Sequence, residues 1–209
     1  MNSIEVKKEL ANAVTHGIGF LLCLVGVPIA LALAVKTGSM KAIWSTSIYS
    51  FCLMMVYLCS TLYHSFSHPL TKRVLRTFDH IAIYFLIAGS YTPFMLFYFN
   101  DTKGHMVLIG VWVLVLIGTI FKIFFTGKWD SISTVIYLAM GWTILLFANR
   151  LMSDVPQGVL FWLAFGGAFY TLGIVFYVWK RLTYHHAIWH IFVLLGSFGH
   201  YMAVIKSFI

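Results

Sequence analysis

The chain has 209 residues, of which 61% are hydrophobic and 10% charged, and its formal net charge is +8. Soluble domains are about 45–50% apolar and about 25% charged, so this composition excludes an ordinary water-soluble globule and favours a lipid bilayer as the solvent. The Lys and Arg residues lie in short gaps between apolar runs, as in loops that flank a membrane, and no nucleic-acid motif accompanies them.

Seven apolar runs divide the sequence. They cover residues 13–35, 42–64, 78–99, 106–125, 131–148, 159–179 and 186–205. Each is close to the roughly 20 residues that a helix needs to cross about 30 Å of hydrocarbon. Short gaps with turn and charge residues separate them, without a linker. We therefore predict an all-α, polytopic membrane protein whose seven transmembrane helices form a single domain over residues 1–209.

The first run could also be a cleaved signal peptide, because Lys7 and Lys8 precede it and Ala32-Leu33-Ala34 resembles a cleavage site. This run is longer than a typical signal core, and polar residues mark its start. We interpret it as the first span.

The basic residues predict the orientation of the seven spans. One side of the membrane receives nine of them: Lys7, Lys8, Lys72, Arg73, Arg76, Lys122, Lys128, Lys180 and Arg181. The other side receives five: Lys36, Lys41, Lys103, Arg150 and Lys206. By the positive-inside rule the N-terminus is expected in the cytoplasm and the C-terminus outside.

The histidines gather at the membrane face where the first span begins. Seven of the nine fall there: His16, His64, His68, His80, His185, His186 and His190. Histidines scattered at the two interfaces would divide more evenly, so this convergence predicts a shared site. His200 is ten residues past His190 and so about 15 Å deeper, where we expect it to line a cavity.

Asp79 is the acidic residue that enters an apolar run. An ionisable group at such a position is costly unless it has a partner, which makes Asp79 a candidate for function. It could instead be a helix N-cap or first-turn acid that the helix dipole stabilises. The neighbouring His80 is expected to face away from it.

Residue spacing indicates which side chains can act together. Ser60 and His64 are four residues apart and share one face of a helix, as do His186 and His190. A catalytic zinc takes three protein ligands plus water, with about 2.0–2.1 Å to each imidazole nitrogen. His64, His186 and His190 could supply three ligands, while Asp79 and Ser60 hold a bound water or orient a ligand.

Each element of this pattern has another interpretation. A single pair of histidines four residues apart is interfacial or part of the packing about as often as it binds a metal. The segment 186–190 also lacks the glutamate of H-E-x-x-H, so the metalloprotease motif is absent.

Three motifs in chain order resemble those of a known family. They are E-x-x-N-x-x-x-H at Glu9, Asn12 and His16, then S-x-x-x-H at Ser60 and His64 followed by Asp79, then H-x-x-x-H at His186 and His190. Together, on seven spans, they resemble the haemolysin III branch of the progestin and adipoQ receptor family. The resemblance covers nearly the whole chain.

The resemblance implies an N-terminus inside the cell and a zinc ion near the cytoplasmic face. The implied ligands are His64, His186 and His190, with Asp79 and Ser60 at the water-holding and supporting positions. It also implies a bacterial cytoplasmic membrane and a link to ceramidase-type amide hydrolysis and lipid homeostasis.

Three functions fit the sequence. The leading one is a zinc-dependent hydrolase of a lipid amide or ester, in which a membrane lipid is the substrate. The second is a non-enzymatic membrane homeostasis or sensor protein that binds a lipid and has a structural zinc. The third is a pore-forming haemolysin, although nothing in the sequence is typical of a secreted, water-soluble protein.

Overall fold

A computed structural model describes residues 3–209, and the secondary structure within this range is entirely helical. The helices are α1 (Ser3–Lys36), α2 (Met40–Ser65), α3 (Pro69–Tyr98), α4 (Thr102–Phe125), α5 (Asp130–Trp142), the 3₁₀ helix η1 (Thr143–Phe147), α6 (Ala148–Asp154), α7 (Gln157–Val178) and α8 (His185–Lys206). Seven segments in the described range are long and apolar enough to cross a membrane, the fifth being Asp130–Asp154. The predicted all-α, seven-span fold is confirmed.

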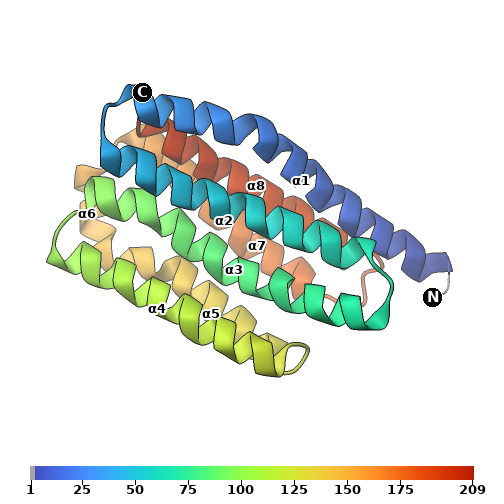
Figure 1. Cartoon of the computed structure of the whole chain (residues 1–209). Coiled ribbons are helices and arrows are strands. Elements are labelled where there is room, and N and C mark those ends of the chain that lie inside the picture. The colour runs from blue at the N-terminus through green and yellow to red at the C-terminus, as the bar shows by residue number, and fades with distance from the viewer. Residues whose placement is uncertain (1–2) are drawn as a thin grey trace.

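The spans form an up-and-down bundle in which consecutive spans are antiparallel (Figure 1). Helix α2 packs between α1 and α3, and α8 packs against α7 and α1. The chain termini lie at opposite ends, as an odd number of spans requires. We call the end that holds the start of α1 the N-terminal end. The α2–α3, α4–α5 and α7–α8 connections also lie there.

Two helices begin well before the apolar runs that predicted them. Helix α1 starts at Ser3 rather than near residue 13, and α3 starts at Pro69 rather than near residue 78. Apolar runs indicate the hydrocarbon depth, whereas a helix continues as long as its backbone geometry allows, and a proline at the first helical position favours such a start. Asp79 therefore lies in the third turn of α3, and its interpretation as an N-cap or first-turn acid is wrong.

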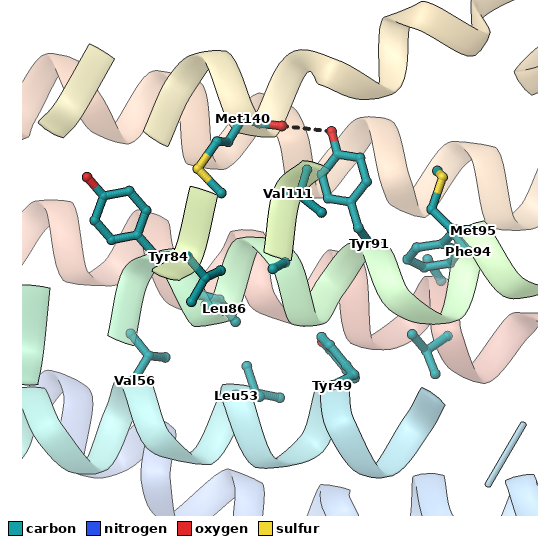
Figure 2. Close-up of a cluster of buried hydrophobic side chains, with 14 of the residues drawn as sticks. Tyr49, Leu53, Val56, Tyr84, Leu86, Tyr91, Phe94, Met95, Val111 and Met140 are labelled. Atoms are coloured by element: carbon teal, nitrogen blue, oxygen red, sulfur yellow. Dashed lines mark hydrogen bonds between the residues drawn. The ribbon is translucent and has the colours of Figure 1, made fainter. Parts of the chain in front are cut away.

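The fifth span is interrupted, although its sequence predicted one continuous helix. The 3₁₀ segment η1 follows α5, and the hydroxyl of Tyr91 lies 2.9 Å from the carbonyl oxygen of Met140 and 2.8 Å from that of Gly141 (Figure 2). The same hydroxyl accepts a hydrogen bond from the backbone N–H of Ile144 at 2.8 Å. Backbone polar groups inside a bilayer need protein partners, and Tyr91 supplies one at this break.

The core is centred on α3, whose most apolar window is 67% buried, compared with 17% for the fifth and sixth spans. Figure 2 shows its inner side chains, such as Leu86 and Tyr91, between α2 and the α4–α5 pair. Large apolar side chains such as Leu21 and Val25 are more than half exposed, as expected for a surface that faces lipid. Asp79 is thus carried by the most enclosed helix.

Candidate metal centre

Three histidines meet at the N-terminal end of the bundle. His64 is in the last turn of α2, and His186 and His190 are in the first two turns of α8. One ring nitrogen from each lies within 4.8 Å of the other two. The ring centroids are 4.6–5.3 Å apart. The structure therefore brings together the three histidines that the sequence predicted as ligands, in an arrangement that could hold a metal ion.

The Nε2 atoms test whether this site fits a metal. Nε2 of His64, His186 and His190 is buried in each case, and none of the three has a hydrogen-bond partner among residues 3–209. A buried polar atom left unsatisfied costs about 1–3 kcal/mol. Because the same three histidines each bring one ring nitrogen within 4.8 Å of the other two, a shared cation would explain these unpaired atoms.

In two of the three histidines the opposite ring nitrogen contacts α1. Nδ1 of His64 lies 2.7 Å from Oε2 of Glu9, and Nδ1 of His190 lies 3.2 Å from the backbone oxygen of Asn12 and 3.0 Å from Oγ1 of Thr15. A carboxylate and a carbonyl can only accept, so both Nδ1 atoms carry the proton. This tautomer leaves the Nε2 lone pairs free to bind a metal.

Two predicted supporting residues lie nearby. Ser60 is 1% exposed, one turn before His64, and its hydroxyl has no partner in the described part of the chain. Asp79 is 7% exposed and lies within electrostatic reach of His64 and His16. The expectation that His80 faces away from Asp79 is wrong, because its Nδ1 lies 3.5 Å from the carboxylate. The proposed roles of Asp79 and Ser60 stay predictions.

The first sequence motif also reaches the site. His16 is 2% exposed and stacks on His190, with ring centroids 3.5 Å apart and an interplanar angle of 14°. The side-chain nitrogen of Asn12 lies 3.5 Å from Nδ1 of His64. His200 instead packs edge-on against Tyr170 between α7 and α8, with a centroid separation of 5.2 Å.

An ion cluster that was not predicted from the sequence lies next to Asp79. Asp130 binds Lys122 at 2.9 Å and Arg76 at 3.0 Å, and His80 Nε2 lies 3.8 Å from it. The lysine was assigned to a loop, yet its side chain is fully buried in the last turn of α4. The signal was available, since Lys122 falls inside the apolar run 106–125.

Fold and site together define a class: a seven-helix membrane protein with a buried histidine triad, suited to a metal ion, near one membrane face. Residues 4–201 match the model of the family described as haemolysin-III related. The chain belongs to this family, and it is a multi-pass protein of the cell membrane.

Curated relatives extend over most of the chain. "Hemolysin-3 homolog" of Bacillus subtilis is 42% identical over 96% of this chain and 94% of its own length. "Hemolysin-3" of Bacillus cereus is 41% identical over 92% of this chain and 88% of its own length. The human "Monocyte to macrophage differentiation factor" is 30% identical over 95% of this chain and 84% of its own length.

Proposed function

We propose that this protein is a zinc-dependent membrane hydrolase that cleaves an amide or ester bond of a membrane lipid. The observation that carries the proposal is the group of three buried Nε2 atoms, on His64, His186 and His190, that have no hydrogen-bond partner within residues 3–209. Imidazole ligands suit zinc. A catalytic zinc site has three protein ligands and keeps its fourth position open.

We further propose that the chain works as one domain with its N-terminal end in the cytoplasm. The site draws residues from α1, α2, α3 and α8, which lie near the two ends of the sequence, so no short continuous segment contains them all. The nine basic residues assigned to the N-terminal end, against five at the other end, support this orientation.

Several residues of the chain would have separate roles in hydrolysis. When bound, zinc supplies a Lewis acid that activates water near neutral pH and polarises the substrate carbonyl. The carboxylate of Asp79 would accept the proton of the attacking water and return it to the leaving group. The free hydroxyl of Ser60 would donate a hydrogen bond to the substrate carbonyl oxygen. The apolar helices would hold the acyl chain.

The test is metal analysis and lipid hydrolysis with the purified full chain. We expect about one zinc per chain, and cleavage of at least one member of a panel of lipid amides and esters. His186→Ala combined with His190→Ala should abolish both, and Asp79→Asn should abolish cleavage but keep zinc. His105→Ala, at the exposed start of α4, is the matched control. Zinc retained in the double variant would refute the site, and fully loaded protein without hydrolysis would refute the reaction.

A second candidate, direct lysis of membranes, comes from the names of the two Bacillus relatives, which are called hemolysins. Purified protein added to dye-loaded liposomes distinguishes the two. Leakage that persists in the double histidine variant would favour a pore, whereas leakage that requires both histidines and releases fatty acid would favour hydrolysis.

A further inference from the structure

Glu9 occupies a position between a predicted metal ligand and a lysine. Its Oε2 atom accepts from Nδ1 of His64 at 2.7 Å and from Nζ of Lys72 at 3.0 Å. The His64 side chain is 4% exposed, whereas those of Glu9 and Lys72 are 26% and 24% exposed. The three side chains come from α1, α2 and α3, so this chain of contacts ties three helices together at the N-terminal end.

Lys72 is itself held in place. Its ammonium donates to the backbone oxygens of Tyr63 at 3.2 Å and Phe66 at 3.4 Å, and it lies 4.6 Å from the centre of the Tyr63 ring. These acceptors belong to the C-terminal end of α2, where a helix dipole favours a cation. Lys72 therefore holds the Glu9 carboxylate beside the turn that carries His64.

The two histidines whose Nδ1 contacts are described above differ in the group that accepts their hydrogen bond. His190 donates to neutral oxygens of Thr15 and Asn12, whereas His64 donates to the Glu9 carboxylate. A carboxylate that accepts from a ligand histidine fixes its tautomer and raises the basicity of the metal-binding nitrogen. Its negative charge also offsets part of the charge of a divalent ion in a poorly solvated site.

We propose that Glu9 is a positioning residue that sets the affinity of the metal centre through His64, and that Lys72 acts on the metal through Glu9. The proposal rests on the metal centre of the proposed function, and it adds two residues outside the ligand set. The simpler alternative is that Glu9 and Lys72 form a surface ion pair, which would contribute little and would leave metal binding unchanged.

The experiment measures zinc affinity by competition with a chelator, using the full chain in detergent, together with the visible spectrum of the cobalt-loaded protein. Glu9→Gln keeps the shape and removes the charge, and it should weaken zinc binding about 10–100-fold and shift the cobalt bands. Asp154→Asn removes the same charge at the opposite end and is the matched control. Monodispersity on size exclusion verifies that each variant is folded.

Lys72→Met provides the second, independent variant. It should weaken zinc binding less than Glu9→Gln, and the double variant should be no weaker than Glu9→Gln alone, because Lys72 acts through Glu9. Additive losses would overturn the role of Lys72. Wild-type affinity and spectrum in Glu9→Gln would overturn the role of Glu9.

These outcomes are distinct from failure of the proposed function. A wild-type chain that binds no zinc would overturn both proposals. A chain that binds zinc, loses affinity in Glu9→Gln and hydrolyses no lipid would overturn only the hydrolase.

Discussion

The ion cluster on α3, α4 and α5, in which Lys122 is buried, leads to a quantitative prediction. In Asp130→Asn the ammonium of Lys122, whose side chain is fully buried, loses the carboxylate that lies 2.9 Å away. Breaking a buried ion pair from one side costs about 3–5 kcal/mol because it leaves an uncompensated charge. Asp130 is 26% and Arg76 39% exposed, so water partly screens the cluster. We therefore expect a loss of about 3 kcal/mol, at the lower end of that range.

The reciprocal change should cost less. In Lys122→Met the buried charge itself is removed, and the Asp130 carboxylate keeps Arg76 at 3.0 Å and His80 at 3.8 Å. Methionine also fills most of the space of the lysine stem. The structure thus predicts that Asp130→Asn is clearly more destabilising than Lys122→Met, although both remove the same ion pair.

The assay is the free energy of unfolding, measured by titrating detergent-solubilised protein with sodium dodecyl sulfate and following loss of tertiary signal. Asp154→Asn removes a carboxylate from an exposed pair with Arg150 and should lose much less stability than Asp130→Asn. A change within about 0.5 kcal/mol of wild type in Asp130→Asn, or a larger loss in Lys122→Met than in Asp130→Asn, would contradict the stabilising role of the Asp130 carboxylate.

Three further predictions use the same titration, and the last of them also uses metal analysis. Gly166→Ala places a methyl group 2.2 Å from Cδ2 of His200 and should cost about 1–3 kcal/mol, whereas Gly167→Ala, with open space around it, should be neutral or stabilising; equal effects would contradict the close α7–α8 contact. Tyr91→Phe removes the hydroxyl at the break of the fifth span and should cost about 1–3 kcal/mol; an unchanged midpoint would contradict its role. His16→Phe preserves the ring stack and should keep zinc, whereas His16→Ala leaves a cavity and should cost about 2–4 kcal/mol; zinc lost from the Phe variant would show that a His16 nitrogen is needed.

The number and type of spans could be predicted because the thickness of the hydrocarbon fixes how many apolar residues a helix needs. The parity of the spans then places helix ends on one face or the other. His64 at the end of the second span and His186 and His190 at the start of the seventh had to share a face. The four-residue spacing of His186 and His190 also places their side chains on the same face of the helix.

Contacts between segments were not predictable in the same way, because they depend on how each helix is rotated about its axis. The pairing of Lys122 with Asp130 and of Lys72 with Glu9 involves two lysines that the basic-residue count treated as loop charges. The break at residues 143–147 could not be predicted from the sequence for another reason. Its sequence, Thr-Ile-Leu-Leu-Phe, is as apolar as that of a continuous span.

Depth in the membrane explains how charge is distributed around the candidate site. The three ligand side chains are imidazoles, which can be neutral and so can lie in an enclosed site without an ionic partner. Glu9 must carry a charge to act on His64, and it lies where α1 extends beyond its apolar run, with a quarter of its side chain exposed. Water at this position lowers the free-energy cost of keeping the carboxylate ionised. The hydrogen bond to His64 transmits the influence of the charge to the buried histidine. A helix of 34 residues, about 51 Å at 1.5 Å per residue, is longer than a span requires, and the additional turns bring an acid to the candidate metal centre without burying it.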